Sequence, residues 1–149
     1  MARPTMVEKL LDVARKKTDH AARSLASLNA REQDAEQQLQ MLLAYRDDYF
    51  TRFHEAARKG MDHDTLSNFH AFIQKLDAAI AEQRKIVADT HHGVHVGQNR
   101  WRAERQRMNS YDILAQRGKM AEARRAGRRE QQDEDEFAAK VHQRNKASA

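Results

Sequence analysis

The sequence has no cysteine, and it has only one proline and five glycines in 149 residues. The absence of cysteine excludes disulfide bonds and thiolate chemistry, and it is compatible with a reducing compartment. No run of about 18 apolar residues is present, so no membrane span is expected. Charged residues interrupt the N-terminal segment, which is therefore unlike a secretory signal. Together these absences predict a cytoplasmic protein.

Aromatic residues are also scarce, at 6% of the sequence, whereas 33% of the residues are charged. This balance is typical of a long helix or coiled coil, with disorder as the alternative. Apolar positions step by four and three from Val7 to Ala56, and again from Leu66 to Ala115. A repeat of about 3.5 residues predicts helices packed along a narrow seam with no hollow core for a substrate. The pattern therefore directs attention to binding partners rather than to a reaction.

The first helix has clear start and stop signals. Pro4 is compatible with a helix start, and Thr5 with Glu8 matches a capping box. Gly60 can end the helix by adopting a left-handed conformation. The first helix is therefore expected over about residues 4–58.

The second helix is expected to follow a short turn over about residues 59–64. Asp62 or Asp64 can cap it. No breaker of comparable strength follows, so we expect helix from about residue 65 to about residue 140. The length of the chain predicts one domain, residues 1–149.

A turn this short makes the two helices antiparallel neighbours. Folding about residue 62 places residue i opposite approximately residue 124 minus i, which sets Trp101 against Ala21 and Ala22. The predicted fold is all-α, a long antiparallel two-helix coiled-coil hairpin. A parallel or domain-swapped homodimer is the alternative.

Two features interrupt the regular apolar pattern. Polar residues, including Glu32, Arg46 and Gln83, occupy seam positions, where such residues can fix the register of the helices. Because a two-helix seam is open to water, we expect these side chains to extend to its edge.

Gly93 and Gly97 each cost up to about 1 kcal/mol relative to alanine inside a helix, which predicts a soft or bent region.

Catalytic and metal-binding patterns are weak. No phosphate-binding glycine loop or nucleophile elbow is present. Two helices cannot enclose a pair of carboxylates in a cleft, so no enzyme activity and no cofactor are expected. His91 and His95 share a helix face, but no third ligand is evident on that face, and we expect solvated histidines and no metal site.

The net charge is +5, and the positive charge is concentrated late in the second helix. Beyond about residue 118 that helix has no partner on the first helix, so it should fray when free and become ordered on a partner. An acidic run from Glu130 to Glu136 follows directly. This dipolar pattern favours docking on a protein. A charged face that is simply solvated and a surface that binds nucleic-acid phosphates remain the alternatives. The basic residues are Arg100, Arg102, Arg105, Arg107, Arg117, Lys119, Arg124, Arg125, Arg128 and Arg129.

An apolar stripe marks the start of the second helix. Leu76 belongs to the seam, whereas Phe72 and Ala79 lie beside it and widen the stripe. Extra apolar residues beside a two-helix seam can form a partner site. Alternatively, Phe72 folds over the edge of the seam.

Two central segments carry a family resemblance, QLQMLLAYRDDYFTRF at residues 38–53 and NFHAFIQKLDAAIAEQRK at residues 68–85. With Trp101 and the late DEFA at residues 135–138, they resemble the FliJ family of the flagellar type III export apparatus. The resemblance covers essentially the whole chain. It implies an antiparallel coiled coil similar to the stalk subunit of rotary ATP synthases.

The resemblance also implies partners. Family members bind the hexameric ring of the flagellar export ATPase and promote its assembly and activity. They contact the export gate protein in the membrane and escort empty export chaperones, which implies a cytoplasmic protein peripherally associated with the inner membrane at the flagellar base. Two alternative functions remain, a basic coiled coil that binds nucleic acid and the equivalent stalk of a virulence secretion system.

Residues for two contacts follow from the resemblance. The gate contact would use Phe72, Leu76, Ala79 and Gln83. The ATPase contact would use the far end of the hairpin and the basic helix beyond it, comprising Leu10, Leu11, Val13, Ala14, Met108, Tyr111, Ile113, Leu114, Arg117, Arg124, Arg125 and Arg128.

Overall fold

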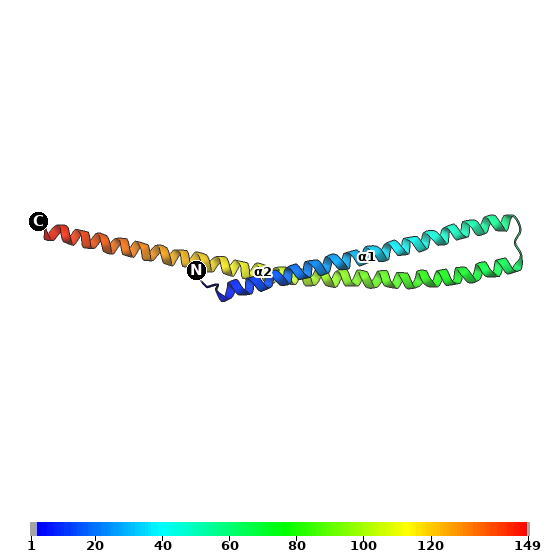
Figure 1. The fold of residues 1–149 in the computed structure, drawn as a ribbon, viewed down its shortest axis with the longest axis horizontal. Coiled ribbons are helices and arrows are strands. Elements are labelled where there is room, and N and C mark those ends of the chain that lie inside the picture. The colour runs from blue at the N-terminus through cyan, green and yellow to red at the C-terminus, as the bar shows by residue number, and fades with distance from the viewer. Residues whose placement is uncertain (1–2, 149) are drawn as a thin grey trace. The chain divides into compact units, whose positions relative to one another are not determined.

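The computed structural model describes residues 3–148, which form the helices α1 (Met6–Arg58) and α2 (His63–Ala147) (Figure 1). The two helices pack against each other, and the predicted all-α helical hairpin is confirmed. Neither helix contains a stretch that is long and apolar enough to cross a bilayer within the described part of the chain. The number of domains remains a prediction.

The chain divides into two compact units, which are described separately. Unit 1 comprises the described residues of Met1–Lys17 and Glu104–Ala149, and unit 2 comprises Thr18–Ala103. Each unit therefore contains a part of α1 and a part of α2. The turn between the helices belongs to unit 2.

The start of α1 is held by the capping box expected from the sequence. The backbone N–H of Glu8 donates to the Thr5 hydroxyl, and the backbone N–H of Thr5 donates to the Glu8 carboxylate, both at 3.2 Å. Thr5 is thus the residue that caps the helix. Pro4 precedes the cap rather than occupying the first helical position, because α1 begins at Met6.

The turn uses a glycine and an aspartate in the expected roles. Gly60 has a φ of 94°, in the left-handed region that disfavours residues with a Cβ. Asp62 caps α2 by accepting a 2.9 Å hydrogen bond from the backbone N–H of Thr65. Hydrogen bonds from the side chain and then the backbone of Thr65 lower the pKa of the Asp62 carboxyl below its ordinary value. This cap places the start of α2 at His63.

Aromatic side chains join the two helices of unit 2 near the turn. Phe69 is 6% exposed and stacks on Phe53, with ring centroids 3.6 Å apart, and on Tyr49, with centroids 5.1 Å apart. Farther from the turn the buried positions on α1 are small. The buried apolar residues of unit 2 are Ala21, Ala35, Phe69, Leu76, Ile80 and Val94.

Polar contacts across unit 2 agree with the predicted alignment. That alignment places Arg46 opposite about residue 78 and Glu32 opposite about residue 92. In the structure Arg46 pairs with Asp77 at 2.7 Å, and Glu32 contacts His91 at 2.5 Å. Within residues 18–103, α1 and α2 are therefore antiparallel neighbours, as Figure 1 shows.

Gln83 differs from the expectation that seam polar residues reach water. It is 7% exposed, and its side-chain amide donates a 2.9 Å hydrogen bond to the carbonyl oxygen of Ala35. The hydrogen bond satisfies the amide inside the seam, so the side chain has no need to extend to the edge.

The helical glycines of unit 2 lie against α1. A Cβ added to Gly97 would come within 2.8 Å of Leu28 Cδ1, and one added to Gly93 would lie 3.6 Å from Leu28 Cδ2. Gly97 therefore allows a close approach of the helices at Leu28. The softness expected at these glycines remains a prediction.

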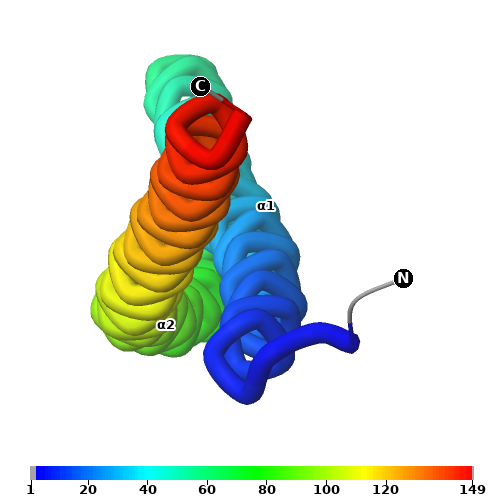
Figure 2. Tube along the Cα trace, turned by 90° about the vertical axis from the view of Figure 1, so that its left-hand side faces the viewer, coloured from blue at the N-terminus to red at the C-terminus, as the bar shows by residue number. Residues whose placement is uncertain are grey.

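Unit 1 pairs the beginning of α1 with a middle part of α2. Its buried apolar residues are Leu11, Ala14 and Ala115, and Arg15 lies 3.9 Å from Asp112 across the two helices. Figure 2 shows the beginning of α1, in blue, beside the yellow part of α2. No described residue beyond Ala115 is buried. The last part of α2 in unit 1 thus carries its side chains in water.

Candidate partner-binding surfaces

The four residues expected at the gate contact belong to unit 2 but differ in burial. Leu76 and Gln83 are 6% and 7% exposed, and both lie in the seam. Phe72 is half-buried, and Ala79 is exposed. Phe72 and Ala79 therefore offer surface to a partner, whereas Leu76 and Gln83 mainly hold the helices together.

Phe72 packs against tyrosines of α1. Its ring centroid lies 4.5 Å from that of Tyr49 and 6.0 Å from that of Tyr45. Phe72 thus folds over the edge of the seam, as the alternative interpretation of the sequence proposed. The apolar surface at this place is shared between α1 and α2.

A shallow groove lies on unit 2 beside these residues. Met41 and Tyr45 supply most of its exposed apolar surface, because their exposed fractions are 71% and 50%. Side chains from both helices line the groove, namely Gln38, Met41, Leu42, Tyr45 and Gln83. A groove lined by apolar side chains with a few polar groups is a common form of partner site.

The residues of the groove on α1 were absent from the sequence-based site. The predicted alignment contains the signal that would have found them, since it places Tyr45 opposite about residue 79 and Met41 opposite about residue 83. Tyr45 and Met41 therefore belong to the same level of the hairpin as Ala79 and Gln83, and the predicted alignment indicates them as part of one surface.

The residues expected at the ATPase contact lie in unit 1. Leu11 and Ala14 are buried in the seam, and Met108 and Tyr111 are half-buried. Apolar side chains outside the seam remain open to solvent. They are Leu10, Val13, Ile113 and Leu114, with exposed fractions between 39% and 50%.

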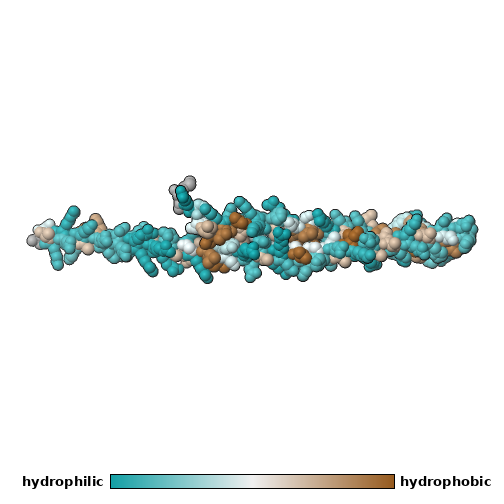
Figure 3. Space-filling view, turned by 90° about the horizontal axis from the view of Figure 1, so that it is seen from below, coloured by the Kyte–Doolittle hydropathy of each residue, from teal (hydrophilic) through white to brown (hydrophobic). Residues whose placement is uncertain are grey.

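The basic residues of the same site are exposed on α2. Arg125 lies 3.7 Å from Glu122, which also contacts Arg129 at 3.2 Å. By contrast, Arg117, Arg124 and Arg128 form no ion pair with another residue of 3–148. Figure 3 shows that this end of α2 is mostly hydrophilic, whereas apolar patches appear along the paired helices.

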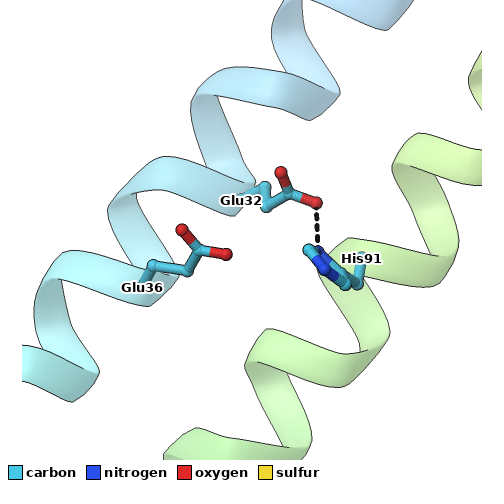
Figure 4. Close-up of side chains that lie close together, drawn as sticks. All are labelled: Glu32, Glu36 and His91. Carbon is cyan, nitrogen blue, oxygen red and sulfur yellow. Dashed lines mark hydrogen bonds and ion pairs between the residues drawn. The ribbon is translucent and has the colours of Figure 1, made fainter.

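A third cluster in unit 2 combines two carboxylates with an imidazole. One ligand atom from each of Glu32, Glu36 and His91 can be chosen so that all three lie within 4.8 Å of one another. Figure 4 shows the two glutamates on successive turns of α1 facing His91 on α2. His95, the other histidine considered from the sequence, is instead 3.4 Å from Asn99. The cluster joins two helices, so the pattern of residues on one helix face does not indicate it.

Comparison with known proteins gives a consistent result. A family model described as flagellar FliJ protein matches residues 6–147. The flagellar FliJ protein of Escherichia coli (strain K12) is 31% identical over 144 residues, which cover 97% of this chain and 98% of the relative. The flagellar FliJ protein of Salmonella typhi gives the same identity and coverage.

Proposed function

Because the chain belongs to the flagellar FliJ family, we propose that it is a non-enzymatic component of the flagellar type III protein export apparatus. The observation that carries the proposal is the family match over residues 6–147, since a two-helix fold alone does not assign a function. The proposed partners are the hexameric export ATPase, the export gate protein and export chaperones.

Unit 1 is the proposed ATPase-binding surface. Val13, Ile113 and Leu114 are each about half exposed, and burying such side chains against a partner is favourable by about 25 cal/mol per Å² of apolar surface. The basic segment from Arg117 to Arg129 follows along the same helix. Arginines without an internal partner complement an acidic surface and speed association with it.

Unit 2 is the proposed gate-binding surface. Phe72, Ala79 and the groove with Met41 and Tyr45 supply apolar surface from both helices. The gate contact would bring the protein to the inner membrane at the flagellar base without a membrane span of its own. Escort of export chaperones is part of the proposal, and no surface is assigned to it.

The ATPase contact is tested by ATP hydrolysis of the cognate flagellar export ATPase with the full chain and with a truncation ending at Ala115. The truncation keeps Ala115, the last buried position among residues 3–148, and with it the buried apolar residues of unit 1. We expect the full chain to stimulate hydrolysis and the truncation to do so less, because it lacks the basic segment. Equal stimulation would remove the basic segment from the site. Absence of both stimulation and co-elution would overturn ATPase binding.

The gate contact is tested with Ala79→Glu, and Ala81→Glu is the matched control on the same helix. Both alanines are exposed, so neither change should unfold unit 2. We expect Ala79→Glu to weaken binding to the cytoplasmic part of the gate protein at least about tenfold, because it buries an unpaired charge. Binding to the ATPase should not change. Equal effects of the two variants on gate binding would contradict the assigned surface.

Leu76→Ala is a poor test of the gate contact. Leu76 is 6% exposed, and removing a buried leucine side chain costs about 2–5 kcal/mol of stability. A loss of binding in that variant would therefore not distinguish a missing contact from a weakened hairpin.

A further inference from the structure

Three potential metal ligands converge at mid-length of unit 2. Glu32 and Glu36 are four residues apart, which places them on the same side of α1. His91 reaches them from α2, and its Nδ1 contacts Glu32 Oε2 (Figure 4). The three ligand atoms lie within 4.8 Å of one another, although 59 residues separate Glu32 from His91.

The backbone at this level holds the two helices close together. Leu28, one turn before Glu32, packs on the helical glycines of α2, with 3.6 Å between its Cδ2 and the position of a Cβ on Gly93. Because Gly93 contributes no side chain of its own, only that of Leu28 lies between the helices there, and glutamate and histidine side chains can reach a common point. Ligands on helices are also held more precisely than ligands on loops.

The ligand types select a class of ion. Calcium and magnesium prefer sites made of oxygen ligands only, whereas an imidazole nitrogen suits zinc and its neighbours in the transition series. Glu32 is the most shielded of the three, with 19% of its side chain exposed. Glu36 forms no hydrogen bond or ion pair with another described residue, so its carboxylate is available.

We propose that Glu32, Glu36 and His91 bind a divalent transition-metal ion of the zinc class and thereby link α1 to α2. Ligand atoms around a tetrahedral zinc ion lie about 3.4 Å apart, and the three atoms here, all within 4.8 Å of one another, are spaced on that scale. Water completes the coordination, as in sites with three protein ligands. The proposal is independent of the export function.

The test is calorimetric titration of the full chain with Zn²⁺ after treatment with a chelator and its removal. We expect binding that is at least about tenfold weaker in His91→Ala and in Glu36→Gln, because each removes a ligand. His92→Ala is the matched control, since His92 is a neighbouring exposed histidine outside the cluster. This variant should bind like the unaltered chain.

Two further measurements separate a built site from general attraction to a charged surface. Zn²⁺ should raise the melting temperature of the unaltered chain and of His92→Ala but not of His91→Ala. Mg²⁺ should not replace Zn²⁺ at equal concentration. The proposal is overturned if His91→Ala binds Zn²⁺ as tightly as the unaltered chain, or if Mg²⁺ binds equally well. Because His91 is exposed, circular dichroism should show the same helix content in every variant.

Discussion

The side-chain amide of Gln83 and the carbonyl oxygen of Ala35 form a 2.9 Å hydrogen bond between α2 and α1. Both residues are buried, with exposed fractions of 7% and 5%. A shift of one helix along the other would separate the two groups and leave a buried amide without a partner. This bond therefore favours one alignment of the helices in unit 2 over its neighbours.

Gln83→Glu should reduce the free energy of unfolding by about 1–3 kcal/mol at pH 7, because a carboxylate would face a carbonyl oxygen without a donor. The loss should shrink at low pH, where the protonated glutamate can donate. Urea unfolding followed by circular dichroism measures the effect. Gln74→Glu is the exposed control, and its change should stay within about 0.5 kcal/mol. An unchanged midpoint in Gln83→Glu would show that the bond contributes nothing.

Phe69→Ala should cost about 3–5 kcal/mol of stability, because the ring is buried and stacks on two aromatic neighbours. Phe137→Ala removes the same side chain from a position that is 71% exposed, and it should change little. Thermal unfolding of the two variants beside the unaltered chain measures the difference. Similar melting temperatures for both variants would contradict an aromatic core near the turn.

Gly93→Ala should stabilise the chain by about 0.5–1 kcal/mol, because alanine favours the helix and its Cβ would meet Leu28 at an ordinary contact distance. Gly97→Ala should gain less or lose stability, because its Cβ would approach Leu28 to 2.8 Å. Urea midpoints of the two variants give the comparison. The opposite order would show that Leu28 does not lie closer to Gly97 than to Gly93.

Asp62→Ala should lower the urea midpoint at pH 7 by removing the cap of α2. The pKa of Asp62 is lowered from 3.8 in the folded chain, so its contribution is complete above that value. The contribution is lost as the pH falls through the lower folded value. The difference between Asp62→Ala and the unaltered chain should therefore be full at pH 7 and smaller near pH 2. A difference that grows on acidification would contradict a charged cap.

Local signals predicted the helices well because each depends on a few neighbouring residues. The spacing of Thr5 and Glu8 predicted the first cap, and Gly60 predicted the left-handed end of α1. The repeat of apolar residues gave the seam, and the single break gave an alignment close to the observed pairing of Arg46 with Asp77.

Features that combine both helices were harder to predict. Whether Gln83 reaches water or stays inside depends on an acceptor supplied by Ala35, which no local pattern identifies. The cluster of Glu32, Glu36 and His91 likewise requires the pairing of segments that are far apart in sequence. Both features can be predicted only when the residues of α1 are matched one by one with the residues that lie opposite them on α2.

The buried side chains follow one narrow line along each helix, and none of the described residues has a large side chain that is fully enclosed. Substitutions on the outer faces of α1 and α2 therefore meet few steric constraints. The amino-acid sequence can drift at most positions while the fold persists, provided that the buried residues of the seam keep their apolar character and size. Affinity for partners can thus evolve separately from the ability to fold.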